Sequence, residues 1–170
     1  MSNTNKICCV IGHREIENTE ALYRRIYDTL LDLIKSGVDT FLFGSRSKFN
    51  DLCLNTVNDI KQCFPYVRRI YVRAEYPNIS VDYERYLLSM YDETYFPDNV
   101  MNAGKASYVK RNFDMINKAD VCVFYYNDKY VPQSMFFQKK AVVPHISVSG
   151  TKIAFNYAKR NNKVVINLYK

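Results

Sequence analysis

The sequence predicts a single doubly wound α/β domain, in which a mainly parallel sheet carries helices on both faces. Two observations predict it. Short apolar runs with strand character alternate with longer stretches whose apolar residues have helical spacing, which is typical of βαβ units with right-handed crossovers. Small-residue turns also recur where helices begin, and two of them directly follow a strand. The three turns are Gly12-His13-Arg14, Gly44-Ser45-Arg46-Ser47 and Ser149-Gly150-Thr151.

The N-terminal part of the chain is predicted to be βαβαβ. The expected elements are a strand at 6–11, a helix from a cap at Asn18 or Thr19 to about Lys35, a strand at 40–43, a helix at 49–63 and a strand at 67–74. Ser36-Gly37 is a typical helix end, and Pro65 closes the second helix. The alternating charges of residues 67–74 favour a position at the edge of the sheet.

The C-terminal part departs from this simple repeat. Its expected elements are a helix at 80–91, a short strand at 92–96, a helix at 106–118, an apolar central strand at 121–126, a strand fragment at 141–143, a helix at 151–161 and a strand at 163–168. Residues 127–148 form a long connection, which we expect to be a lid beside the ligand-binding edge or a disordered loop. We expect one domain over residues 1–170.

The amino-acid composition limits the classes of partner that we expect the protein to bind. The chain of 170 residues has 24 Lys and Arg against 17 Asp and Glu, a net charge of +7. Such a charge attracts phosphate-rich partners, or it belongs to a solvated surface with a mild preference for anions. No apolar stretch is as long as a membrane span and no signal peptide begins the chain, so we expect a cytoplasmic protein without a membrane partner. The five cysteines lack metal-ligand spacing, which predicts free thiols, no metal site and no required cofactor.

The three turns predict an anion site. Helix N-termini present unpaired backbone N–H groups, and small residues let a phosphate approach them closely. If the strands are parallel, the turns meet at the carboxyl edge of the sheet, where α/β proteins bind ligands. The candidate phosphate-binding residues are Gly12, His13, Arg14, Gly44, Ser45, Arg46, Ser149, Gly150 and Thr151.

Several candidates have an alternative explanation. His13 could bind phosphate or act as a base, or it could be a turn histidine bonded to neighbouring backbone. Arg14 is a phosphate clamp or a solvated arginine, and Arg46 with Lys48 could contact phosphate or lie exposed in the first turn of a helix. We expect a side chain at position 150 to occupy the space of the phosphate, and to strain the backbone if φ there is positive.

Three motifs occur in a characteristic order: Ile11-Gly12-His13-Arg14, then Arg111-Asn112-Phe113-Asp114-Met115 followed by Ala119-Asp120, and finally Ser149-Gly150-Thr151. In these motifs the chain resembles the SLOG superfamily of Rossmann-like proteins, which groups DprA/Smf proteins, LOG phosphoribohydrolases and YpsA-like proteins. The likeness is greatest to the YpsA-like branch. The resemblance implies a Rossmann-like fold, contacts from Arg111 and Asn112 to a nucleotide-like ligand, and a homo-oligomer. The second turn departs from the family pattern, because two glycines and an aspartate are replaced.

The resemblance also bears on catalysis. LOG enzymes pair an arginine, matched here by Arg111, with a glutamate whose position falls on Ala154. Alanine cannot serve as a general acid or stabilise an oxocarbenium ion. We therefore expect a sensor or regulatory module that binds a nucleotide or nucleotide-derived ligand, rather than an enzyme. Two alternatives stay open: an N-glycosidic nucleotide hydrolase using Glu84, Asp92 or Glu93, and single-stranded DNA binding by analogy with DprA.

Overall fold

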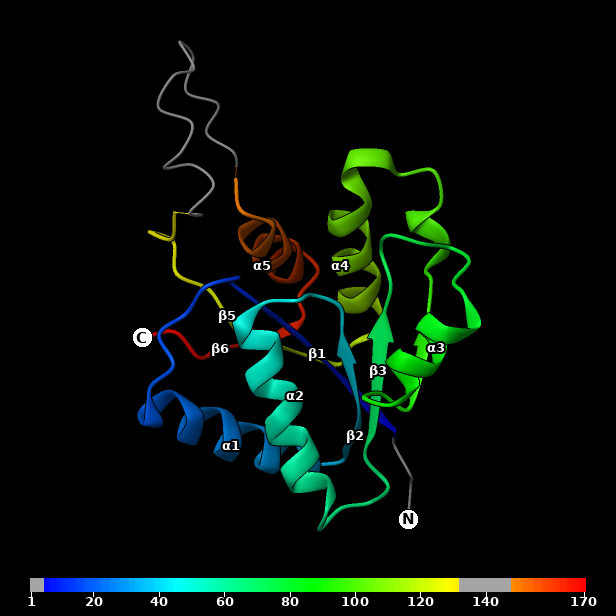
Figure 1. Ribbon diagram of the computed structural model, residues 1–170. Coiled ribbons are helices and arrows are strands. Elements are labelled where there is room, and N and C mark those ends of the chain that lie inside the picture. The colour runs from blue at the N-terminus through cyan, green and yellow to red at the C-terminus, as the bar shows by residue number, and fades with distance from the viewer. Residues whose placement is uncertain (1–4, 132–147) are drawn as a thin grey trace.

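The computed structural model describes residues 5–131 and 148–170, and in them the chain forms one six-stranded, all-parallel sheet. The strand order is β4-β3-β2-β1-β5-β6 (Figure 1). The strands are β1 (Lys6–Gly12), β2 (Val38–Phe43), β3 (Arg68–Val72), β4 (Glu93–Tyr95), β5 (Val121–Tyr125) and β6 (Val164–Asn167). The order of connections reverses between β1 and β5, so the predicted doubly wound α/β fold is confirmed.

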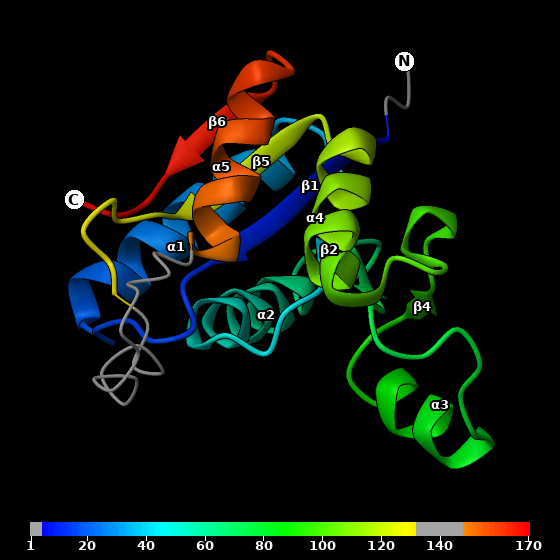
Figure 2. The same cartoon turned by 90° about the horizontal axis from the view of Figure 1, so that it is seen from above.

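Helices cover both faces of this sheet. They are α1 (Glu20–Lys35), α2 (Lys48–Lys61), α3 (Val81–Leu88), α4 (Ser107–Lys118) and α5 (Gly150–Arg160), with short 3-10 helices η1 (Asp98–Val100) and η2 (Gly104–Ala106) before α4. The pair α1 and α2 packs on one face and the pair α4 and α5 on the other (Figure 2). Four of the five α-helices begin at a Ser or Thr side chain that accepts a backbone N–H of the first turn.

Alternation along the central strand separates two apolar cores. Cys8 and Val10 of β1 pack toward α1 and α2, whereas Cys9 and Ile11 pack toward α4 and α5. Neighbouring strands are in register, with Cys9 beside Leu42 of β2 and Cys122 of β5. Side chains of successive strand residues point to opposite faces, so a run that is apolar at every position is what a doubly covered strand requires. All five cysteines are free, as predicted, and four of them are buried.

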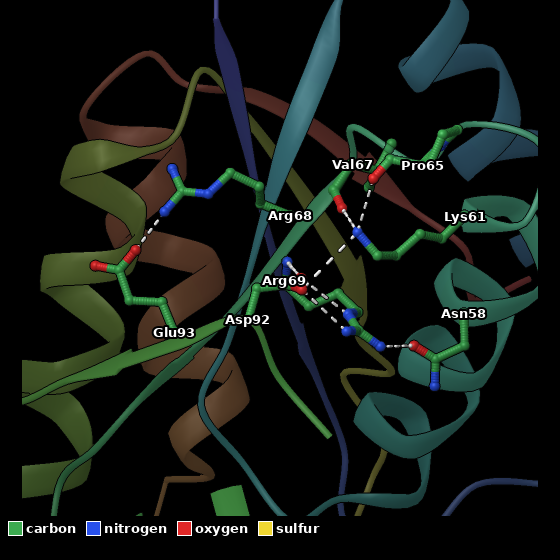
Figure 3. A network of polar contacts seen from close by, with 8 residues as sticks. All are labelled: Asn58, Lys61, Pro65, Val67, Arg68, Arg69, Asp92 and Glu93. Atoms are coloured by element: carbon green, nitrogen blue, oxygen red, sulfur yellow. Dashed lines mark hydrogen bonds and ion pairs between the residues drawn. The ribbon is translucent and has the colours of Figure 1, made fainter. Parts of the chain in front are cut away.

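The predicted edge position of the third strand is wrong, because β4 pairs with β3 and forms that edge. The charges that suggested an edge belong to cross-strand contacts. Arg68 forms an ion pair with Glu93, and both the backbone N–H and the guanidinium of Arg69 donate to Asp92 (Figure 3). The short strand expected near residues 92–96 supplies these acidic partners.

The same network ties α2 to the sheet. Lys61, the last residue of α2, donates to the carbonyl oxygens of Pro65 and Val67, and its ammonium lies 3.8 Å from Asp92. Arg69 also donates to Asn58 of α2 over 2.7 Å. Figure 3 shows these side chains converging where β3 and β4 begin. The network therefore stabilises the amino edge of the sheet, opposite the edge where the strands end.

The predicted helices and strands of the described residues occur in the predicted order. The fragment expected at 141–143, and most of the connection at 127–148, lie outside the described residues. Within the part of the chain that is described, no helix has the length and apolar character needed to cross a bilayer.

Candidate functional site

A cleft of about 620 Å³ lies at the carboxyl edge of the sheet. It is lined by residues at and after the ends of β1, β2 and β3, by residues of α4, by the start of α5, and by Tyr83 of α3. All eleven candidate residues line it: Gly12, His13, Arg14, Gly44, Ser45, Arg46, Arg111, Asn112, Ser149, Gly150 and Thr151. The structure thus brings the three turns and the α4 motif together in one place, beside the reversal of strand order where α/β sheets bind ligands.

Two glycines permit close packing beneath the cleft. A Cβ on Gly12 would lie 2.2 Å from Cδ1 of Phe49, whose side chain is fully buried. A Cβ on Gly44 would lie 2.7 Å from the sulfur of Met115 and 2.8 Å from Cδ of Arg111. These glycines therefore let α2 and α4 approach the ends of β1 and β2.

The two helices that begin at the cleft differ in their free donors. At α2, the Lys48 N–H donates to the carbonyl of Arg14 over 3.0 Å, and Ser47 accepts the N–H of Asn50. At α5, Ser149 caps the N–H of Lys152 over 3.1 Å. The hydrogen bonds found within residues 5–131 and 148–170 include none donated by the N–H groups of Gly150 or Thr151. Among the described residues these two N–H groups are therefore not engaged, as is usual for the first residues of a helix.

His13 is held by backbone and by an aromatic ring. Its side chain is 2% exposed, its Nε2 accepts the N–H of Asn127 over 2.8 Å, and the Tyr130 ring stacks on it with centroids 3.9 Å apart. Burial lowers the pKa of His13 to about 4. The same Nε2 lies 3.2 Å from the carbonyl oxygen of Asn127, and Nδ1 has no hydrogen-bond partner among the described residues. His13 is therefore the neutral, backbone-bonded turn histidine of the second interpretation, and at neutral pH it brings no positive charge to the cleft.

Arg111 is a buried cation. Its side chain donates to the carbonyl of Gly44 and to Oδ1 of Asn112, and the residue is 4% exposed. Burial lowers its pKa, whereas the ring hydroxyls of Tyr71 and Tyr108 and the carboxylate of Glu75 act in the opposite direction. Arginine nevertheless stays protonated in proteins, so a positive charge is held at the floor of the cleft by neutral oxygens.

The charges along the cleft are unbalanced. Four arginines line it: Arg14, Arg46, Arg73 and Arg111. The seven ion pairs found among the described residues include none of these four. The two glutamates of the lining have other partners, because Glu15 pairs with Lys48 at 2.6 Å and Glu75 accepts the Tyr108 hydroxyl at 2.5 Å. The cleft therefore favours an anionic ligand.

Sequence reasoning missed several lining residues: Tyr71, Arg73, Glu75, Tyr76, Tyr83, Tyr108 and Tyr130. Those at the end of β3 could have been predicted. Residues that follow parallel strands meet at the carboxyl edge of the sheet, and this holds for β3 as it does for β1 and β2. Tyr83 and Tyr108 carried no comparable signal, because they lie on helices whose position depends on tertiary packing.

Other candidates lie away from the cleft. Asp92 and Glu93 belong to the amino-edge network, and Glu84 is an exposed residue of α3 outside the lining. Ala154 is 1% exposed in the core beneath α5, so a glutamate there would be buried rather than face a ligand. Within residues 5–131 and 148–170, no three His, Cys, Asp or Glu side chains gather as metal ligands do.

Comparison with known proteins adds no assignment. No protein-family model matches the chain, and no curated protein sequence matches it.

Proposed function

We propose that the chain is a SLOG-type module that binds a nucleotide or nucleotide-derived ligand at the carboxyl edge of its sheet. The observation that carries this proposal is the meeting in one cleft of three small-residue turns and four arginines that form no ion pair with the carboxylates of the described residues. Guanidinium groups and free helix N–H groups are the donors that phosphate prefers.

The shape and lining of the cleft also suit a nucleotide. Its volume lies within the range of small-molecule sites. Tyrosine rings line it beside the arginines, and Arg111 lies 5.4 Å above the ring centroid of Tyr108. Aromatic faces stack on bases while cations bind the phosphate, so the two kinds of side chain match the two parts of the ligand.

A hydrolase is the second candidate function. The position of the Glu75 carboxylate in the cleft favours it. Glu75 is a carboxylate of the cleft whose charge acts on Arg111. Its hydrogen bond from Tyr108 gives it a structural partner, which favours binding over catalysis. Incubation with AMP separates the two functions: release of free adenine supports the hydrolase, and recovery of intact AMP supports the binding module.

The experiment that tests the proposal is native mass spectrometry of freshly purified protein, followed by calorimetric titration with the nucleotide that it retains. Arg14→Ala should weaken binding by about 10- to 150-fold, since a hydrogen bond to a charged group contributes about 1.5–3 kcal/mol. Arg24→Ala, an exposed residue of α1 paired with Glu20, is the matched control and should leave affinity unchanged. Protein that retains no nucleotide, and binds none at millimolar concentration, would refute the proposal.

A further inference from the structure

A second group of donors lines the cleft from its centre toward β3 and α3. Four residues form this tyrosine–arginine cluster: Arg46, Tyr71, Tyr83 and Arg111. They come from the turn after β2, from β3, from α3 and from α4, so each is brought there by a different element.

The contacts within the cluster are between arginines and neutral oxygens. Arg46 donates to the hydroxyl of Tyr83 across 3.5 Å, which is a long and weak hydrogen bond. Burial and the neighbouring Tyr83 raise the pKa of Tyr71, while the charges of Arg111 and Arg46 and a hydrogen bond from Arg46 oppose that shift. Tyr71 therefore lines the cleft near both guanidinium groups.

The chemistry of the cluster is that of a donor surface. A guanidinium has no acceptor, and a phenol that accepts from Arg46 still has its own proton to donate. Two acceptors beside the cluster already receive hydrogen bonds: the Gly44 carbonyl accepts from Arg111, and the Glu75 carboxylate accepts from Tyr108. A group made only of acceptor oxygens, such as a phosphoryl group, is the complement of this surface.

The two tyrosines of the cluster come from elements on the far side of the sheet from α5. Tyr71 belongs to β3, whereas α5 packs against β1 and β6, and β2 lies between β3 and β1. Adjacent strands are about 4.8 Å apart, so β3 and β1 are on the order of 10 Å apart. Both views show α4 between α3 and α5 (Figures 1 and 2). The tyrosines of the cluster and the start of α5 are therefore placed by elements two strand spacings apart, and Arg46 and Arg111 come from the elements between them.

We propose that the tyrosine–arginine cluster is a second phosphoryl subsite, and that the ligand is a nucleotide carrying two separated phosphoryl groups. The inference rests on the proposed function and deepens it, since it fixes the class of nucleotide. The backbone donors of Gly150 and Thr151 bind one phosphoryl group, and the cluster binds the other.

The test begins with inorganic phosphate, added to isotopically labelled protein and followed by two-dimensional NMR. We expect two independent sets of shifts, one at the backbone amides of Ser45, Arg46 and Tyr71 and one at those of Gly150 and Thr151. The double variant Tyr71→Phe/Tyr83→Phe should weaken the first site by about tenfold and leave the second unchanged. Tyr86→Phe, an exposed tyrosine of α3, is the matched control.

A second titration compares AMP with adenosine 3′,5′-bisphosphate and a 5′-phosphorylated diadenylate. At least one doubly phosphorylated probe should bind more tightly than AMP, and the advantage should vanish in the double variant. Shifts confined to Gly150 and Thr151, or an advantage that survives in the double variant, would overturn the second subsite. If AMP binds and the cluster takes no phosphate, the proposed function stands and this inference fails. If neither nucleotide nor phosphate binds, both fail.

Discussion

Gly12→Ala should destabilise the protein, because the new methyl group has no space. Its Cβ would lie 2.2, 2.5 and 2.7 Å from Cδ1, Cγ and Cβ of Phe49. The Phe49 ring cannot turn toward solvent, since it is fully buried and packs 5.6 Å from the Tyr125 ring. Overpacking costs about 1–3 kcal/mol, and the lower entropy of the unfolded chain with Ala offsets at most about 1 kcal/mol. The contact at 2.2 Å sets the expected net loss at about 2 kcal/mol.

Gly150→Ala is the matched control. Among the described residues, no heavy atom lies within 4 Å of a Cβ built at position 150, and φ there lies outside the positive region that strains other residues. The condition for strain at Gly150, a positive φ, is therefore not met. Urea unfolding followed by circular dichroism should show Gly150→Ala within about 0.5 kcal/mol of the parent chain. If the Gly12→Ala variant proves as stable as the parent chain, the close packing of β1 against α2 is refuted.

Two further predictions concern pH. Burial lowers the pKa of His13 to about 4, while the unfolded chain protonates near 6.5, so the unfolded state binds the proton first. The free energy of unfolding should fall by about 2–3 kcal/mol between pH 6.5 and 4, and urea titrations of His13→Gln should lack that part of the slope. Partial burial disfavours the Asp92 carboxylate, but the hydrogen bonds and charge of Arg69, with the charge of Lys61, outweigh it and lower its pKa. Asp92→Asn should therefore cost about 1 kcal/mol at pH 7, and the difference should disappear as the pH falls through the lowered pKa. A difference that persists at pH 2 would contradict the ion-pair account.

The order of helices and strands could be predicted because local rules and tertiary packing agree. In α1, the buried Leu22, Ile26, Leu30 and Ile34 form the stripe that helical spacing predicts, and Thr19 caps the first turn. The position of β3 could not be predicted in the same way. Its charges are satisfied by Asp92 and Glu93, whose pairing across the sheet is a long-range contact that local spacing does not encode.

The residues of the candidate site also fall into two groups: those that local sequence rules place correctly, and those whose position depends on long-range packing. Residues that follow a strand or begin a helix share one edge of a parallel sheet, so Gly12, Ser45 and Gly150 could be placed together from sequence. Tyr83 and Tyr108 reach the cleft because α3 packs against β4 and α4 packs against β1, which depends on the irregular chain between the two helices. The neutral state of His13 was also beyond sequence reasoning, since it follows from burial and from the Asn127 backbone.

Burial has opposite consequences for the two basic side chains at the centre of the cleft. His13 avoids the free-energy cost of a buried charge by remaining neutral, because its pKa moves below the neutral range. Arg111 cannot do so, since even a lowered arginine pKa leaves the guanidinium protonated. Its hydrogen bonds to Gly44 and Asn112 satisfy donors without neutralising the charge. Glu75 acts on Arg111 without forming an ion pair with it among the described residues, so we expect an anion bound in the cleft to stabilise this edge of the sheet.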